Sequence, residues 1–525
     1  MRERFKNGEK KLNGVNFMDD KNEYKVKRID ITQGVNEILL CQDDAEDLGL
    51  HIHDRVKVIN DKGKSLSALV DITDTVVCKG EVGAFVELWK DLNLKDGTTV
   101  NIVPASRPTS IDFIRKKIYG NTWTQEEIDT IVDDIASGSL SDIELAAYAT
   151  SIQINGMNMD EIYGLTMAMV RTGETIDWDV SPILDVHSIG GVPGNKYAPI
   201  TVPIVAANGL IIPKTSSRAI SSAAGTADIM EVVCNVTYDA QSIKRIAQAV
   251  GGTLVWGGGV NLAPVDDAII KVEYPLSLDP HGQVLASVMA KKKSIGAEYC
   301  VIDIPIGEGT KVLTIENARS LARDFIILGE KLGIRTRCAI TYGGQPVGRA
   351  IGPALEIKEV LSILEGAEKP NSIIEKSLSI AGILLELGGA AAPNKGVELA
   401  KKTLKSGKAL EKFREIIGAQ GGNPDVKSED IIPGKYTYDL PSLKDGYIET
   451  INNRGIVKIA RAAGSPKDKG AGIILKFKKG ERAEAGQPLF TIYSDNKRKL
   501  DDAKILASKL QPVRIEGMIL GEVVE

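Results

Sequence analysis

The chain has 525 residues, 43% hydrophobic and 26% charged, enough for several folding units, and its formal net charge of −5 excludes a nucleic-acid binder that relies on a generally basic surface. The five cysteines are odd in number and lie far apart, which indicates neither a disulfide framework nor a zinc site and favours a reducing cytoplasm. No apolar run reaches the 18 residues that span a bilayer, and the polar first residues are not typical of a signal peptide, so we expect a soluble cytoplasmic protein without a membrane partner.

The first part of the chain is predicted to be a small β domain. Residues 1–22 are polar and are expected to be disordered, whereas residues 23–105 contain short β-rich runs broken by turns. The domain contains a weak internal repeat. Asp47–Leu50 is followed by Val56–Val58, and the similar segment Asp91–Leu94 is followed by Val100–Ile102. Each half predicts a short helix, a tight turn and a closing strand, so we expect a duplicated, barrel-like β domain. A chance similarity within an ordinary β domain is the alternative.

Residues 106–180 are predicted to form a helical lobe, completed by part of 266–295. Two capping-box pairs, Thr124 with Glu127 and Ser141 with Glu144, precede apolar-periodic stretches. The segment Asp160–Arg171 carries apolar residues at helical spacing. These patterns are typical of a helical bundle.

Residues 181–435 alternate between strand-like and helical stretches. Strands are predicted over Ile200–Ala207, Gly209–Pro213, Ala297–Ile306 and Arg335–Thr341, and a helix over Ile315–Leu332. This alternation predicts a large α/β domain with a parallel sheet.

Residues 436–525 are predicted to form a small α+β domain of the barrel-sandwich type. Strands are expected over Gly470–Lys478 and Gln487–Tyr493, on either side of a Lys-Lys-Gly-Glu turn. Such hairpins carry biotin or lipoate in other proteins, but no lysine stands here in a Met-Lys-Met context. We therefore interpret the hairpin as structural.

Two polar turns carry the residues suited to chemistry. The first, Asp185–Lys196, places glycines where a helix is expected to begin, and backbone N–H groups at such a point bind anions. The second, Lys214–Asp228, offers four serine and two threonine hydroxyls together with Lys214 and Arg218. A plain glycine turn and a solvated, serine-rich helix cap are the alternatives. Strand ends at one edge of an α/β sheet are, however, where ligands bind.

The joint pattern resembles a known family. Asp-x-His-Ser-x-Gly-Gly-Val at Asp185–Val192, followed by Lys-x-Ser-x-Arg-(x)7-Thr-x-Asp-x-x-Glu at Lys214–Glu231, is similar to the signature of the thymidine and pyrimidine nucleoside phosphorylases. Further matching segments are Leu262–Asp266, Ala286–Lys292, Gly344–Gly348 and Ala354–Glu356. The resemblance begins near Pro108 and implies an α/β multidomain enzyme in which a helical lobe and a larger α/β lobe flank a cleft. It implies inorganic phosphate as co-substrate, no cofactor and no metal.

The chain departs from the pyrimidine pattern at three places. Val186 stands where the family has lysine, Ser222–Gly225 where it has His-Thr-Gly-Gly, and Val272 or a neighbour where an arginine grips the pyrimidine base. With the added N-terminal domain, these changes resemble the nucleoside monophosphate branch, the AMP phosphorylases typical of archaea. The resemblance implies that the added domain serves assembly into a homodimer or larger homo-oligomer, that the small-molecule partners are nucleotide and phosphate, and that no nucleic acid is bound.

The resemblance also implies Asp279 as proton donor and a set of residues that bind nucleotide and phosphate. These are Gly191, Ser217, Arg218, Ala219, Ile220, Ser221, Ser222, Thr226, Ser287 and Lys311, to which we add His187, Ser188 and Ser216. A departing purine accepts a proton on a ring nitrogen, so a carboxylic acid suits the step, and Asp279 would have to be buried to hold its proton near pH 7.

Three of these residues have ordinary alternatives. Asp279 is otherwise the N-cap of the following helix, and Lys311 is either a point charge for the 5′-phosphate or a surface lysine. Arg218 is either bidentate to a phosphate or ribose oxygen or paired with Asp228 or Glu231.

The favoured hypothesis is phosphorolysis of AMP to adenine and ribose 1,5-bisphosphate, with CMP and UMP as further substrates. A pyrimidine nucleoside phosphorylase is the first alternative, against which the missing arginine and Val186 count. A non-catalytic nucleotide-binding assembly protein is the second, against which the retained Arg218, Thr226 and Ser287 count.

Overall fold

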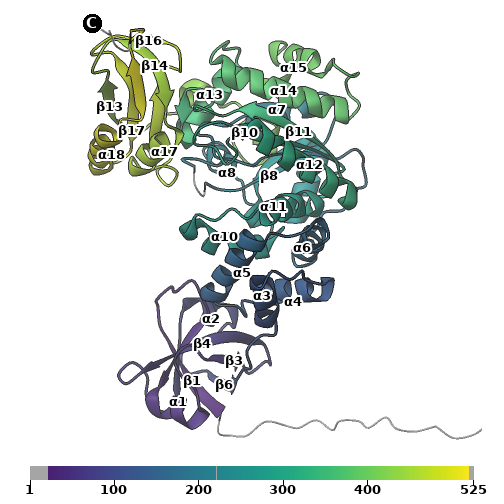
Figure 1. Ribbon diagram of the computed structural model, residues 1–525, viewed down its shortest axis with the longest axis vertical. Helices are drawn as coiled ribbons and strands as arrows, with labels where there is room; N and C mark the ends of the chain where they lie inside the picture. The colour runs from purple at the N-terminus through teal and green to yellow at the C-terminus, as the bar shows by residue number, and fades with distance from the viewer. Residues whose placement is uncertain (1–21, 220–221, 520–525) are drawn as a thin grey trace, which may run out of the picture. The chain divides into compact units, whose positions relative to one another are not determined.

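The computed structural model describes residues 22–219 and 222–519, and the chain forms two units (Figure 1). The first unit holds the described chain up to residue 114 together with residues 133–145, and the second holds the remainder. Apart from Asn22, the segment expected to be disordered lies outside the described residues.

Six strands of the first unit form a closed barrel. In hydrogen-bonded order they are β1 (Glu23–Arg28), β5 (Glu81–Ala84), β2 (Glu37–Cys41), β4 (Ser65–Thr73), β3 (Arg55–Ile59) and β6 (Thr99–Pro104). Helix α1 (Gln42–Leu48) follows β2, and helix α2 (Val86–Asp91) follows β5. The pattern of strand pairing occurs twice. Strand β1 lies parallel to β5 and antiparallel to β6, and strand β4 in the same way lies parallel to β2 and antiparallel to β3. Equivalent elements therefore come from the two halves of the sequence repeat.

Four helices follow the barrel in the chain: α3 (Ser110–Ile118), α4 (Gln125–Ala136), α5 (Asp142–Asn155) and α6 (Met159–Arg171). The two predicted capping boxes form, since Thr124 and Glu127 exchange side-chain-to-backbone hydrogen bonds, as do Ser141 and Glu144. These local signals therefore fix where α4 and α5 begin.

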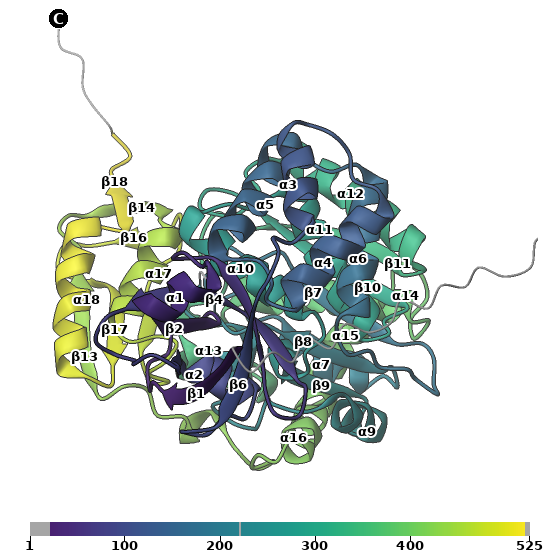
Figure 2. The ribbon, with the colours of Figure 1, turned by 90° about the horizontal axis from the view of Figure 1, so that it is seen from below.

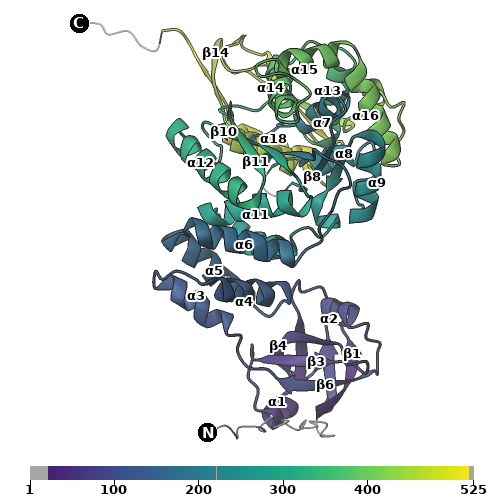
Figure 3. The same ribbon diagram turned by 90° about the vertical axis from the view of Figure 1, so that its right-hand side faces the viewer.

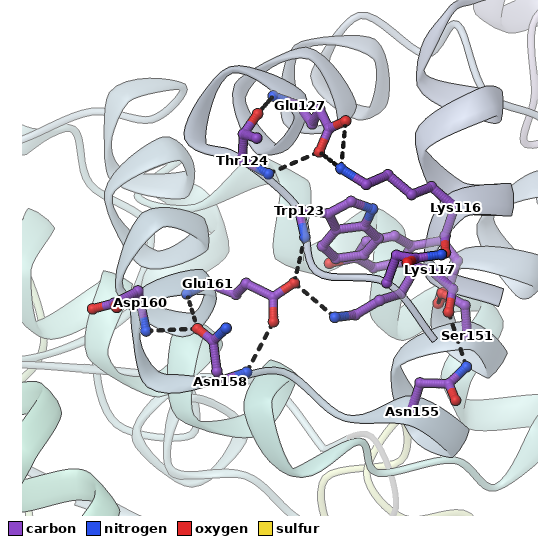
Figure 4. A network of polar contacts seen from close by, with 12 residues as sticks. Lys116, Lys117, Trp123, Thr124, Glu127, Ser151, Asn155, Asn158, Asp160 and Glu161 are labelled. Carbon is purple, nitrogen blue, oxygen red and sulfur yellow. Dashed lines mark hydrogen bonds and ion pairs between the residues drawn. The ribbon is translucent and has the colours of Figure 1, made fainter. Parts of the chain in front are cut away.

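A buried polar network holds the second unit's helices together (Figure 4). The Glu161 carboxylate, 3% exposed, accepts hydrogen bonds from Lys117 Nζ and from the Trp123 backbone N–H, each at 2.7 Å. It also accepts from the Asn158 N–H, which closes the capping box of α6. Because the buried charge is paired and hydrogen-bonded, it is compensated within the fold.

Helix α6 packs against α11 (His281–Ser294), which lies beside it in Figure 3. The Tyr148 hydroxyl of α5 donates to Gln283 Oε1 of α11 at 3.1 Å. Helix α10 (Pro264–Leu276) also contacts α6. The helical part of this unit is thus built from two stretches of chain that are distant in sequence.

Five parallel strands form the centre of the α/β part. Strands β11 (Arg335–Tyr342), β10 (Tyr299–Ile306) and β7 (Leu184–Ser188) form one sheet in that order, and β8 (Ile212–Ser216) pairs with β9 (Gly252–Trp256). A parallel bridge between Ile183 and Ile211 connects β7 to β8. The chain proceeds from β7 toward β9 in one direction and from β10 to β11 in the other. The topological switch point therefore lies between β7 and β10.

Helices cover both faces of these strands. Helix α12 (Ile315–Leu332) packs against β10 and β11 on one side, and α14 (Asn371–Leu387) packs against the same strands on the other (Figure 3). Helix α7 (Ala198–Ala206) packs against β8, β9 and α14. The remaining helices are α8 (Thr226–Met230), α9 (Ala240–Val250), α13 (Pro353–Leu364), α15 (Gly396–Lys405) and α16 (Lys408–Ala419). The central strands are accordingly buried on both faces.

The predicted strand over Ile200–Ala207 is wrong, because these residues form α7. All nine residues of α7 are buried, so no polar face marks a helical period in the sequence, and a short apolar run is then compatible with either structure. Pro199, in the first turn, fits the start of a helix. The prediction over Gly209–Pro213 is correct only at its end, since β8 begins at Ile212.

The C-terminal part contains two small sheets and two helices. A four-stranded sheet has the order β12 (Ala350–Ile351), β15 (Gly472–Leu475), β17 (Pro488–Ser494) and β13 (Tyr436–Pro441), and a three-stranded sheet has the order β16 (Arg482–Ala483), β14 (Gly446–Ile451) and β18 (Val513–Glu516). Helix α18 (Lys497–Leu510) lies along β13 and β17 (Figure 2), and α17 (Asn453–Ala462) packs beside α18. Because β12 precedes α13, the first sheet is shared with the α/β part. The turn residue Lys478 donates to Gly348 O at 2.9 Å, so this lysine is engaged within the protein.

Candidate active site

Predicted site residues lie at the carboxyl ends of β7, β8 and β10. Ser188 ends β7, Ser216 ends β8, and residues 307–311, here called the lysine loop, follow β10. The turn after β7 and the lysine loop touch, because a Cβ at Gly191 would lie 3.0 Å from Lys311 N. Gly191 has φ +89°, a conformation in which a side chain would also be strained. Glycine at this position therefore lets two loops meet at the switch point.

The lysine loop brings Lys311 to Asp279. Lys311 Nζ lies 2.5 Å from Asp279 Oδ1, with 35% and 55% of the two side chains exposed. The burial expected for the Asp279 carboxyl is thus absent from the structure. Its alternative role as a helix cap is also absent, because Pro280 occupies the N-cap of α11. The predicted acid and the predicted phosphate-binding lysine are instead direct neighbours.

The charges of four lysines act on His187. Burial and then the positive charges of Lys292, Lys214, Lys291 and Lys311 hold the pKa of His187 well below its usual value, so the imidazole is neutral at pH 7. Three of these lysines are paired with carboxylates, Lys292 with Asp185, Lys311 with Asp279 and Lys291 with Asp266, so their charges are partly compensated. An oxyanion such as phosphate would compete with these carboxylates for the lysines.

Two of these lysines are deeply buried. Lys292 Nζ forms an ion pair with Asp185 at 2.5 Å, and both side chains are at most 1% exposed. Lys214 is 4% exposed, and burial together with the neighbouring Lys292 lowers its pKa to about 7. Lys214 therefore changes charge near neutral pH.

We expect anion binding to weaken as the pH rises through about 7, because Lys214 is charged below this pH and neutral above it. The unfolded chain keeps a lysine charged up to about pH 10.4. Between about pH 7 and about pH 10.4 the unfolded chain therefore binds more protons than the folded protein. The free energy of unfolding consequently rises with pH in this range, as far as Lys214 determines it. Sulfate keeps a constant charge in this range, and its inhibition constant against phosphate should increase about tenfold between pH 6.5 and 8.5. An inhibition constant that does not change would contradict this role, and Lys214→Arg, which stays charged, is the matched control.

A buried network supports Ser188 from behind. Asn195 Nδ2 donates to Ser188 Oγ at 3.1 Å and to Asp303 Oδ2 at 3.3 Å. Asp303, fully buried on β10, accepts from Thr341 Oγ1 at 2.5 Å and pairs with Lys376 Nζ at 2.8 Å. The sequence interpretation missed this network, although one charged residue within the apolar strand Tyr299–Ile306 was a signal for Asp303.

The described residues 217–219 and 222–225, here called the serine loop, lie between β8 and α8. The Asp228 carboxylate closes the loop, since its Oδ2 accepts from Ala219 N at 2.7 Å and from Gly225 N at 2.9 Å. Arg218 makes a bidentate pair with Glu231 at 2.7 and 2.5 Å and lies 4.8 Å from the ring centre of Trp256. Of the two roles that the sequence left open for Arg218, the structure shows the pairing with carboxylates.

The other predicted residues lie around these loops. Ser216 Oγ donates to Val255 O, Ser217 is exposed, and Ser222 Oγ donates to Ala224 O. Thr226 begins α8, and Ser287 of α11 lies 3.4 Å from Lys291 Nζ. Ile220 and Ser221 lie outside the described residues.

A second carboxyl lies near Asp279. Glu273, on the last turns of α10, is 9% exposed, and burial followed by the charges of Asp266 and Asp279 raises its pKa to about 8. Its Oε1 has no hydrogen-bond partner among the residues that the structure describes. Glu273 is therefore a neutral acid at pH 7, a feature that the sequence interpretation missed.

Comparison with known families matches three segments of the chain, all of them after the barrel strands. Residues 111–173 match the helical bundle domain of a glycosyl transferase family, residues 180–410 match the a/b domain of the same family, and residues 447–513 match the pyrimidine nucleoside phosphorylase C-terminal domain. Anthranilate phosphoribosyltransferase from Thermus thermophilus is 18% identical and superposes with a TM-score of 0.51 over 59% of this chain and 100% of its own, which shows a shared fold. The fold and the site thus define a pentosyltransferase.

Relatives of nearly full length narrow the family. AMP phosphorylase from Methanococcoides burtonii is 51% identical over 94% of this chain and 98% of its own length, and those from Thermococcus kodakarensis and Pyrococcus furiosus are each 50% identical with the same coverage. The chain belongs to the AMP phosphorylase family.

Two kinds of feature are absent from the part of the chain that the structure describes. Within residues 22–219 and 222–519, no helix is long and apolar enough to cross a bilayer. The same ranges hold no group of three or more His, Cys, Asp or Glu side chains placed to bind a metal ion.

Proposed function

We propose that this chain cleaves AMP with inorganic phosphate to give adenine and ribose 1,5-bisphosphate, and that it accepts CMP and UMP as well. The observation that carries the proposal is that the turn after β7 touches the lysine loop, whose Lys311 is paired with Asp279. The reaction brings together two anions, the attacking phosphate and the 5′-phosphate of the nucleotide. Positive charges at the strand ends lower the electrostatic free energy of holding both anions close together.

In the proposed reaction a phosphate oxygen forms a bond to C1′ while the bond from C1′ to the base nitrogen breaks. The electron pair leaves with the base, and Asp279 gives its proton to a ring nitrogen of the purine. Ser188, Ser216 and Thr226 bind the attacking phosphate. Lys311 and the serine loop bind the 5′-phosphate.

The ion pair between Lys311 and Asp279 gives the 5′-phosphate a second effect. Because Lys311 Nζ is 2.5 Å from Asp279, a nucleotide phosphate competes with this carboxylate for the lysine. Once Lys311 turns to the dianion, Asp279 loses its partner, and the base shields it from water. The Asp279 carboxyl is then free to turn toward the departing base.

The test is release of free base from AMP, CMP, UMP, adenosine and thymidine, each with and without phosphate. The proposal expects phosphate-dependent release from the monophosphates and none from adenosine or thymidine. Release from thymidine alone would favour a pyrimidine nucleoside phosphorylase, the class named by the C-terminal family model. Binding of AMP without release of base would favour a non-catalytic protein.

We infer that the chain forms a homodimer or larger homo-oligomer and that the N-terminal barrel serves this assembly. Exposed apolar side chains support association, since Tyr119 and Ile154 are 77% and 74% exposed. Analytical ultracentrifugation of the full chain, compared with a Tyr119→Ser/Ile154→Ser variant, tests the association. A monomeric wild-type protein would contradict it.

A further inference from the structure

The C-terminal domain is anchored to the serine loop. Arg461 of α17 donates to Ser222 O at 3.3 Å, across 239 residues of sequence. Ala223, 1% exposed, belongs to the same apolar core as Ile456 and Ile459 of α17. The stretch that replaces His-Thr-Gly-Gly of the pyrimidine enzymes is therefore packed into the C-terminal domain.

The base of the serine loop is held by four charged residues, one of which comes from the C-terminal part. Lys469 Nζ lies 2.7 Å from Glu231 and 3.9 Å from Asp228. Arg218 contacts the same two carboxylates at 2.5 and 3.4 Å. Arg218 and then Lys469 lower the pKa of Glu231 to about 2 against the effect of burial, so its charge persists at all working pH values. Since Asp228 also binds both ends of the loop, Lys469 is connected to the loop backbone through one carboxylate.

The lysine loop is also held from the C-terminal domain. Asn453, at the first turn of α17 and 2% exposed, donates through Nδ2 to Glu308 O at 3.2 Å and to Gly343 O at 2.8 Å. A Cβ at Gly309 would lie 3.1 Å from Asn453 Cβ, so the loop backbone lies directly against this side chain. The two loops approach the site from different strands but share one support.

We propose that Lys469 and Asn453 are positioning residues through which the C-terminal domain fixes the spacing of the serine and lysine loops, and thereby the affinity for the nucleotide. This inference rests on the proposed function, in which these two loops bind the nucleotide. A ligand gripped by two loops binds most tightly when their spacing is set before it arrives. The attacking phosphate depends mainly on groups at the ends of β7 and β8, so its binding should be much less sensitive.

The test is Lys469→Met in the full chain, since this side chain is 35% exposed and its loss leaves the core intact. We expect the KM for AMP to rise about fivefold, with kcat and the KM for phosphate within about twofold of wild type. Lys469→Arg should restore the KM for AMP to within about twofold of wild type. A general loss of stability would not produce this separation of constants.

Glu481→Gln is the matched control. It removes the ion pair with Arg349 at 2.8 Å, which joins the same two parts of the chain through residues outside both loops, and should leave all three constants unchanged. An unchanged KM for AMP in Lys469→Met, or an equal rise in Glu481→Gln, would overturn the inference. Calorimetric titration of AMP into the same proteins measures the effect without turnover. An inactive wild type would contradict the proposed function, whereas wild type and Lys469→Met with equal affinity for AMP would contradict the positioning role.

Discussion

Replacement of Asp279 by asparagine is expected to lower kcat for release of adenine from AMP by about 100-fold or more, the contribution typical of a positioned general acid. The dissociation constant for AMP should change by less than about tenfold, because the amide keeps the shape of the carboxyl and frees Lys311 for the 5′-phosphate. Steady-state kinetics and calorimetric titration of AMP give the two quantities separately. A kcat that stays near the wild-type value would remove the acid role from Asp279.

Glu273→Gln is the control for this assignment. The pKa of Glu273 is raised to about 8, so the side chain is neutral at pH 7, and a neutral amide of the same shape should leave turnover nearly unchanged. If Glu273→Gln loses turnover and Asp279→Asn keeps it, the proton comes from the buried carboxyl of α10.

Replacement of Lys292 by methionine is expected to lower the free energy of unfolding by about 3–5 kcal/mol, because it leaves the Asp185 charge buried without its partner. Asp185 is fully buried, and besides the lysine its carboxylate accepts a hydrogen bond from the Val186 N–H at 2.7 Å, which cannot replace a positive charge. Urea unfolding followed by tryptophan fluorescence measures the loss, and unfolding at the wild-type urea concentration would contradict it.

The double variant Asp185→Asn/Lys292→Met distinguishes the loss of the ion pair from the loss of the packing of the lysine stem. With both charges gone, the desolvation of an unpaired ion disappears, so this protein should be more stable than the single variant. Equal destabilisation in both would indicate that the lysine stem acts by packing alone.

Local signals predicted several elements closely. The helix predicted over Ile315–Leu332 coincides with α12, which has Thr314 as N-cap and Gly333 at φ +73° after its last turn. The strand predicted over Arg335–Thr341 ends one residue short of β11. The prediction failed over α7, where uniform burial removes the periodic polar face on which such arguments depend.

The site was predictable only in part. The residues at the strand ends lie in two short motifs, so Ser188, Ser216 and the serine loop could be chosen from sequence. The residues that hold these loops in place could not be predicted from the sequence. Lys376 contacts Asp303 from a separate element, and Lys469 contacts Glu231 across 238 residues. Nothing in the sequence around a lone surface-type lysine indicates which distant carboxylate it will meet. The environment of Asp279 likewise depends on Lys311, which arrives on another loop.

The helical part of the second unit has a consequence for synthesis on the ribosome. Helix α6 packs against α11, and the Tyr148 hydroxyl bonds to Gln283, 135 residues later in the chain. The barrel strands, in contrast, are complete once Pro104 has emerged. The barrel can therefore close early, while α5 and α6 keep apolar surface uncovered until α11 leaves the exit tunnel. At about 5–20 residues per second, the 135 residues between Tyr148 and Gln283 take about 7–27 seconds, an interval in which the uncovered apolar surface is open to a chaperone.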